Sequence, residues 1–186
     1  AVGLFDLSHM GELWITGDEA VDFLRYALVS DPGALEPGQA QYSMLCAEDG
    51  GIIDDLICYR TDDGYLVVCN ASNREAVVGQ LSALVAAGDW DARLDDRSDA
   101  TGLIAPQGPN AAEIVGSLTD LDLGAIANYH AARGSVAGVA CLVARTELLQ
   151  RLGPFDGDLH GDGPGRRNRG GDGGRCADHA AGGGSC

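Results

Sequence analysis

The sequence predicts an α+β domain in which helices cover an antiparallel sheet, and three observations support this fold class. Three extended apolar runs, at residues 41–46, 52–60 and 65–70, are separated only by short turns rich in Asp and Gly. Such connections are typical of an antiparallel meander. Two stretches with apolar residues at helical spacing lie on either side of these runs. Hairpin-linked strands combined with covering helices indicate the α+β class.

The first strand and the first helix are expected within residues 11–28. The segment GELWIT (11–16) is typical of a strand, and a helix should follow it because Thr16 and Glu19 fit a capping box. The Pro and Gly residues of DPGALEPG should end this helix. The apolar residues at helical spacing are Ala20, Phe23, Leu24, Ala27 and Leu28.

A second helix should follow the meander and pack on the sheet. Ser72 and Glu75 fit a second capping box at its start. Its apolar face is formed by Val77, Val78, Leu81, Leu84 and Val85. Further along the chain we expect a strand at residues 102–106, a turn and helix at 107–118 with Pro109 near the first helical turn, and a last strand at 139–146.

Residues 147–186 differ in character from everything before them. Twelve of these 40 residues are Gly, and the regular alternation of apolar and polar residues is lost. Such a stretch cannot bury enough apolar surface to offset the entropy lost on ordering. We therefore expect a partial domain at residues 1–146, followed by a disordered, low-complexity, Gly-rich tail at 147–186.

The overall charge argues against two classes of partner. The 186 residues include 12 Arg, no Lys and 28 Asp plus Glu, so the formal net charge is −16. This charge repels phosphate backbones and anionic lipid, and no apolar run has the length of a membrane span. We therefore expect neither nucleic acid nor a membrane surface as a partner.

The six cysteines favour a reducing compartment. They are widely spaced, without a Cys-x-x-Cys pair and without a nearby His at metal-ligand spacing. Three of them, Cys46, Cys58 and Cys69, lie in apolar runs, where free cysteine behaves as a small apolar residue. The N-terminal residues show no signal-peptide pattern. These features predict a cytoplasmic protein with free thiols and no metal site.

Asp54 and Asp55 form an unusual pair of charges within an apolar strand. Neighbouring side chains of a strand point to opposite faces, and both faces are apolar here. If one face packs on the core and the other lines a cavity, at least one carboxylate is poorly solvated, which raises its pKa unless a donor or cation compensates. Such a carboxylate can serve as a proton acceptor or as an anchor for a ligand N–H group. The alternative is an edge strand whose Asp side chains face water and discourage edge pairing.

Four other positions each have a structural and a functional interpretation. Tyr42 is either a core-facing aromatic residue or a platform for a flat ligand, and Asn70 is either a helix cap or a ligand-binding amide. For His9 a structural role is favoured over that of a catalytic base. The pair at 50–51 is better explained as a hairpin turn than as a phosphate-binding loop.

Five segments, in order and at similar spacing, resemble the aminomethyltransferase family, the T-protein of the glycine cleavage system. The family patterns are GLFDxSHM, QYxxxxxxxGGxxDDL, VVNAxNxE, ALQGPxA and VARTGYTGEDGFE. The matching segments here are GLFDLSHMGELWITG, AQYSMLCAEDGGIIDDLICYR, YLVVCNASNRE, IAPQGPNAA and GSVAGVACLVART. The resemblance extends across residues 1–146.

The resemblance implies the folate-binding fold of this family, a reaction and two partners. In that reaction tetrahydrofolate, as co-substrate, receives the one-carbon unit of an aminomethyl group carried on the lipoyl arm of H-protein. The products are methylenetetrahydrofolate, ammonia and dihydrolipoyl H-protein. The resemblance also implies that Asp55 is the catalytic carboxylate and contacts the folate, and that Tyr42 and Asn70 line the folate site.

The chain departs from the family pattern at two places. After VART the family continues GYTGEDGFE, whereas residues 147–158 read ELLQRLGPFDGD, and Pro106 replaces a Leu. We hypothesise a reading-frame shift near codon 146, which the nucleotide sequence would test. Because the missing residues would complete the pocket, we expect weak or no turnover from this chain alone. The alternative functions are a non-catalytic folate-binding protein and an inactive fragment of the enzyme.

Overall fold

The computed structural model describes residues 1–146, and the tail expected at 147–186 lies outside the described residues. Its centre is a five-stranded antiparallel sheet with the strand order β3-β4-β5-β2-β6. The strands are β2 (Gly11–Thr16), β3 (Ala40–Cys46), β4 (Ile52–Thr61), β5 (Gly64–Cys69) and β6 (Arg93–Asp96). The predicted meander of β3, β4 and β5 is confirmed, and so is the α+β class.

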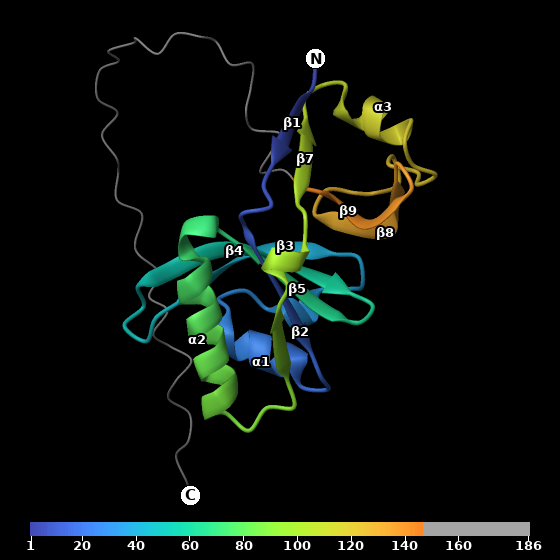
Figure 1. Cartoon of the computed structure of the whole chain (residues 1–186). Coiled ribbons are helices and arrows are strands. Elements are labelled where there is room, and N and C mark those ends of the chain that lie inside the picture. Colours follow the sequence, from blue (N-terminus) through green and yellow to red (C-terminus); the bar gives the residue numbers. More distant parts are fainter. Residues whose placement is uncertain (147–186) are drawn as a thin grey trace, which may run out of the picture.

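Two helices, α1 (Ala20–Ala27) and α2 (Arg74–Ala87), cover one face of this sheet. Figure 1 shows α2 lying across the strands, with α1 near its lower end. Phe23 and Leu24 of α1 and Val77 and Leu81 of α2 are completely buried against sheet residues such as Val67. The apolar stripes predicted for both helices therefore form the main core.

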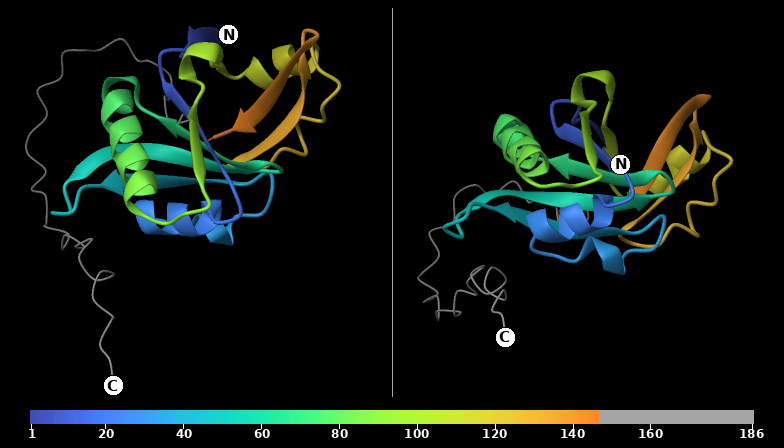
Figure 2. Two further views of the ribbon diagram at one scale, coloured as in Figure 1. Left: turned by 60° about the horizontal axis from the view of Figure 1, so that its bottom comes forward. Right: turned by 90° about the horizontal axis from the view of Figure 1, so that it is seen from below.

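The opposite face of the sheet is covered by a hairpin of β8 (His130–Val136) and β9 (Val139–Arg145). Both views of Figure 2 place this hairpin away from α2. Its Ala131 and Leu142 pack against Ala40, Tyr59 and Leu66. The second core is smaller, so this face is covered over only part of its length.

A separate two-stranded ribbon is formed by β1 (Gly3–Asp6) and β7 (Ile104–Gln107), and it extends away from the sheet in Figure 1. Pro106 lies opposite Leu4 in this ribbon. Because β7 has a single neighbouring strand, a residue without an N–H is tolerated there. The remaining elements are α3 (Ala111–Gly116) and three 3₁₀ turns, η1 (Pro32–Ala34), η2 (Ala71–Asn73) and η3 (Ser98–Ala100).

Both predicted capping boxes are wrong. Helix α1 begins one residue after Glu19, whose carboxylate instead accepts the backbone N–H of Asp91 at 2.6 Å. Helix α2 begins after the turn η2, so its N-cap residue is Asn73, which makes no side-chain cap hydrogen bond. The sequence pattern located the two helices but not the turns that precede them.

Several smaller expectations can also be compared with the structure. The pair at 50–51 forms the expected hairpin turn, in which Gly50 has a φ of 83°. Among the described residues, Cys58, Cys69 and Cys141 are free thiols. No helix within residues 1–146 is long and apolar enough to cross a membrane.

Candidate functional site

The two neighbouring carboxylates of β4 lie on opposite faces of the sheet, as strand alternation predicts. Strand β4 pairs with β3 on one side and with β5 on the other, so the alternative of an edge strand is wrong. Asp54 lies on the face that the helices cover, whereas Asp55 lies on the face that the hairpin partly covers. The two acids therefore have different surroundings although they are adjacent in the sequence.

Asp54 is the buried member of the pair, with 2% of its surface exposed. Three N–H groups donate to its carboxylate. The Asn70 backbone N–H lies 2.8 Å from Oδ2, and the side-chain nitrogens of Asn70 and Asn73 lie 2.9 and 2.6 Å from Oδ1. A buried carboxylate is expensive unless hydrogen bonds compensate it, and these donors provide that compensation.

Asp55 is exposed, which corrects the expectation that the candidate catalytic carboxylate would be poorly solvated. The covering hairpin packs on the part of the face around Tyr59 and Leu66, and Asp55 lies four residues before Tyr59 on β4. Two side chains nevertheless hold the carboxylate. The Tyr42 hydroxyl donates to Oδ2 at 2.9 Å and the Asn70 Nδ2 donates to Oδ1 at 2.9 Å.

The register of β3 on β4 explains the contact with Tyr42. Met44 lies directly opposite Asp55, and Tyr42 is two residues away on the same face. Such diagonal neighbours are within reach of a long aromatic side chain. Tyr42 is 42% exposed, so the core-facing interpretation is wrong. Because its hydroxyl donates to the Asp55 carboxylate, the pKa of Tyr42 is raised above its ordinary value.

Asn70 occupies the position where β5 ends and η2 begins. Its side chain makes no capping hydrogen bond, so the interpretation as a helix cap is wrong. Its Nδ2 instead lies 2.9 Å from each of three oxygens, which are Asp54 Oδ1, Asp55 Oδ1 and the Asp55 carbonyl oxygen. The structure thus brings together all three predicted site residues, Tyr42, Asp55 and Asn70.

A second carboxyl group on the same face as Asp55 was not predicted from the sequence. Glu12 of β2 lies opposite Val68, is 2% exposed, and neither of its carboxylate oxygens has a hydrogen-bond partner within residues 1–146. Its backbone N–H donates to Ser98 Oγ at 2.9 Å. The alternation of strand β2 could have signalled it, because Glu12 shares its face with the large apolar side chain of Trp14.

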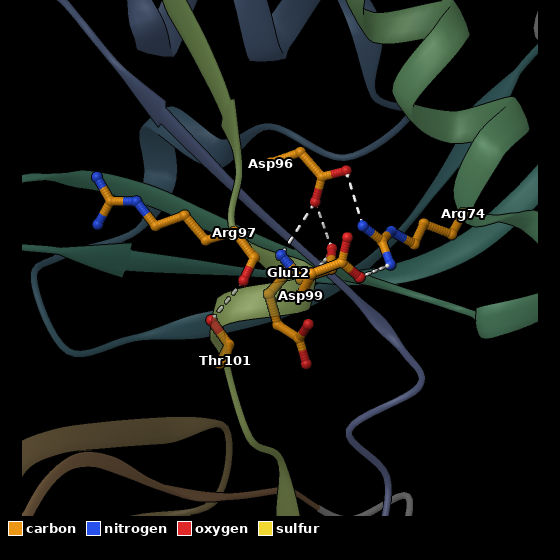
Figure 3. Close-up of polar contacts among 7 residues, drawn as sticks. Glu12, Arg74, Asp96, Arg97, Asp99 and Thr101 are labelled. Atoms are coloured by element: carbon orange, nitrogen blue, oxygen red, sulfur yellow. Dashed lines mark hydrogen bonds and ion pairs between the residues drawn. The ribbon is translucent and has the colours of Figure 1, made fainter.

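Figure 3 shows why Glu12 has no cationic partner although Arg74 is nearby. The Arg74 guanidinium pairs with Asp99 at 2.8 Å and with Asp96 at 3.2 Å. Burial is the main reason why the pKa of Glu12 is raised to about 7; Arg74 lowers it, and Asp96 raises it further. Glu12 is therefore an acid that changes its charge close to neutral pH.

The site is an open surface and not an enclosed cavity. Two cavities, of about 300 and 180 Å³, lie beside Gly17 and beside Arg60, and Asp55 lines neither of them. His9 is exposed, and the structure gives its side chain no hydrogen bond within residues 1–146, so the expected role as a hydrogen-bonded structural histidine is wrong. No group of His, Cys, Asp or Glu side chains in the same range is arranged to hold a metal ion.

The fold and these side chains together define an α+β domain with a braced carboxylate on an open sheet face. The GCVT N-terminal domain family matches residues 1–153 of the chain. The chain therefore belongs to the GCVT N-terminal domain family, that of the glycine cleavage T-proteins. The predicted resemblance is confirmed over the part of the chain that carried its motifs.

Its relatives are aminomethyltransferases. The aminomethyltransferase of Streptomyces coelicolor is 51% identical over 145 residues, which are 77% of this chain and 38% of the relative. That of Thermus thermophilus is 45% identical over 147 residues, which are 78% and 42% of the two chains. The chain thus spans about two fifths of the length of these curated relatives.

A solved structure supports the same assignment. The glycine cleavage system aminomethyltransferase T from Bartonella henselae superposes with a TM-score of 0.60 at 33% identity. The superposition covers 70% of this chain and 35% of that chain. The fold class predicted from the sequence, with the family's antiparallel sheet and covering helices, is therefore confirmed.

Proposed function

We propose that this chain is the N-terminal part of an aminomethyltransferase that moves a one-carbon unit to tetrahydrofolate. The donor in this proposal is the aminomethyl group on the lipoylated H-protein of the glycine cleavage system, and ammonia is released. The observation that supports the proposal most is the arrangement of Tyr42 and Asn70 around the Asp55 carboxylate. These are the three positions to which the family resemblance assigns the folate site.

The hydrogen-bonding capacity of the site suits a reduced folate. Tetrahydrofolate carries N–H groups on a flat ring system, and an exposed carboxylate is a good acceptor for such groups. In the proposed mechanism Asp55 accepts a folate N–H and takes its proton as the new carbon–nitrogen bond forms. Tyr42, through its hydroxyl, holds Asp55 in position, while its exposed ring can lie against the ligand.

The partner and the location follow from the same proposal. We assign the lipoylated H-protein as the protein partner, and neither nucleic acid nor membrane, because the net charge of −16 repels both. The free thiols of Cys58, Cys69 and Cys141 suit the cytoplasm. Residues 1–146 act in this proposal as a partial folate-binding domain, and residues 147–186 as a low-complexity tail produced by a frame shift.

Titration of the purified chain with tetrahydrofolate tests the binding half of the proposal. We expect measurable binding that is lost in Asp55→Asn, because the amide halves the acceptor capacity of the site. Asp63→Asn is the matched control, since Asp63 is an exposed acid in the β4–β5 turn, at the opposite end of that hairpin from Asp55. Equal binding by Asp55→Asn and the control would contradict the assigned role of Asp55.

An assay with aminomethylated H-protein tests the catalytic half and separates it from the alternatives. Production of methylenetetrahydrofolate is unique to the transferase, whereas a non-catalytic binding protein binds folate without turnover. An inactive fragment does neither. We expect weak or no turnover from the 186-residue chain, because it spans about two fifths of its relatives and its site is open. Robust turnover by the purified chain would show that the described site is sufficient.

A further inference from the structure

We propose that Asp54 is a positioning residue that orients the side-chain amide of Asn70, so that Asn70 offers its carbonyl oxygen to the ligand. The inference rests on the proposed function, in which Asn70 and Asp55 meet tetrahydrofolate. It adds a role for the buried member of the acid pair. It also specifies which Asn70 atom contacts the ligand.

The end of the β4–β5 ladder provides the place for this contact. The last paired residues are Leu56 and Cys69, so the next pair in register would be Asp55 and Asn70. The ladder stops there, and the backbone N–H of Asn70 donates to the Asp54 carboxylate at 2.8 Å. If the ladder continued, a backbone carbonyl of β4 would accept this N–H. The Asp54 carboxylate takes its place, and it fixes the position of Asn70 at the end of β5.

The same carboxylate, together with two oxygens of Asp55, determines which way the Asn70 amide faces. Asn70 Nδ2 lies 2.9 Å from the Asp54 side chain and 2.9 Å from both the Asp55 side chain and the Asp55 carbonyl oxygen. All of these atoms are acceptors when the acids are ionised, and only an N–H2 group is attracted to them. The reversed amide would place its carbonyl oxygen against three oxygens, so the network excludes it.

This orientation leaves the other end of the amide free for a ligand. Within residues 1–146 no donor to Asn70 Oδ1 is present among the hydrogen bonds of the structure, and the residue is half-buried beside the open face. Asp55 and the Asn70 carbonyl oxygen thus form a pair of acceptors. The site selects a ligand edge that presents two N–H donors, a pattern that a reduced pterin offers.

The contact with Asn73 shows that Asp54 also has a structural role. Asn73 Nδ2 donates to Asp54 Oδ1 at 2.6 Å, and Asn73 directly precedes α2. A test of positioning must therefore use a measurement that a loss of stability alone does not change. The side-chain amide resonances of Asn70 and a double-mutant cycle in ligand affinity both meet this requirement.

The first measurement is NMR of the full chain, in which Asn70→Ala identifies the Asn70 side-chain amide signals. We expect Asp54→Asn to shift these signals and to speed their hydrogen exchange about tenfold, the effect of losing one charge-assisted hydrogen bond. The control Asp63→Asn should leave them unchanged. Unchanged Asn70 signals in folded Asp54→Asn would overturn the proposal. If Asp54→Asn does not fold, Asp54→Ser, which keeps a short acceptor oxygen, is measured in its place.

The second measurement is the affinity of the same variants for tetrahydrofolate. Asp54→Asn and Asn70→Ala should each weaken binding about tenfold, and the double variant should bind no more weakly than Asn70→Ala alone. A roughly hundredfold loss in the double variant would show that Asp54 acts independently of Asn70, and would overturn the proposal. If the unmodified chain does not bind tetrahydrofolate, the proposed function fails, and the NMR result still decides whether Asp54 orients Asn70.

Discussion

The two faces of the five-stranded sheet differ in what covers them, and Asp54 and Asp55 show the consequence within one dipeptide. The helix-covered face buries Phe23, Leu24, Val77 and Leu81, and it buries Asp54 together with its three donors. The hairpin-covered face is closed at one end and leaves Asp55 exposed at the other. A single step along the strand therefore separates a carboxylate that stabilises the fold from one that is available to a ligand.

Glu12 qualifies this contrast, because it is buried on the same face as Asp55. Its main chain is held by Ser98 Oγ of η3 and by the N–H of Arg97, which directly precedes η3, while its carboxylate has no partner within residues 1–146. The face that bears the candidate site therefore contains the accessible carboxylate of Asp55 and, in Glu12, a buried acid with a raised pKa.

The largest effect is expected on the helix-covered face. Phe23 is completely buried and meets Trp90 edge-on, with ring centroids 6.0 Å apart. Phe23→Ala should lower the free energy of unfolding by about 3–5 kcal/mol, because it removes a large core side chain and leaves a cavity. Tyr26→Ala is a matched control: Tyr26 is on the same helix, also contacts Trp90, and is 66% exposed. Urea denaturation that gave equal losses for both variants would contradict the assignment of the core.

The next effect is a dependence of stability on pH that comes from Glu12. Its folded-state pKa of about 7 lies above the ordinary value of 4.5, so the folded protein binds the proton more tightly than the unfolded chain. Stability is therefore lost as pH rises from about 4.5 to 7. The free energy of unfolding of Glu12→Gln should therefore increase relative to that of the unmodified chain as pH rises. Between pH 4 and pH 8 this difference should grow by about 2–3 kcal/mol in favour of the variant.

Denaturation curves at several pH values check the Glu12 prediction. The exposed acid Glu36 provides the control, because Glu36→Gln changes the net charge by the same amount without removing a buried group. A stability difference between Glu12→Gln and the unmodified chain that stays constant from pH 4 to pH 8 would refute the assignment. It would mean that the carboxyl group is solvated in the folded protein.

The smallest effect on stability is expected for the phenol that holds Asp55. Tyr42→Phe removes the 2.9 Å hydrogen bond to an exposed carboxylate, so the free energy of unfolding should change by less than about 1 kcal/mol. Tetrahydrofolate affinity should fall up to about tenfold, because Asp55 loses one of its two supports. Tyr26→Phe, at an exposed tyrosine of α1, should change neither quantity. A large loss of stability with unchanged affinity would contradict the division between the faces.

The sequence predicted those parts of the fold that follow from local patterns. The meander of β3, β4 and β5 was predicted because Asp/Gly turns separate apolar runs, and α1 and α2 because apolar residues recur at helical spacing. Strands β1, β6 and β8 were missed. Residues 93–96 (RLDD) and 130–136 (HAARGSV) have little apolar alternation, and they are strands because of the partners they pair with.

The site was predicted in part. The motif resemblance named Tyr42, Asp55 and Asn70, and the structure gathers them, although their roles remain proposals. Alternation predicted that Asp54 and Asp55 would be separated, but it could not show which face would be buried. That depends on where α2 and the β8–β9 hairpin pack, which no local pattern encodes. The two capping boxes failed for a related reason, because turn η2 and the partner of Glu19 depend on tertiary contacts.

Asp54 stabilises the fold and orients Asn70, whereas Asp55 meets the ligand, and paired measurements on two variants distinguish these roles. Unfolding and tetrahydrofolate titration should be recorded for Asp54→Asn and Asp55→Asn side by side. Asp54→Asn should lower the free energy of unfolding by about 1–3 kcal/mol, because buried donors lose their acceptor, and should weaken binding about tenfold without abolishing it. Asp55→Asn should change it by less than about 0.5 kcal/mol and should abolish binding. The reverse pattern, with a destabilised Asp55→Asn that still binds tetrahydrofolate, would contradict the account.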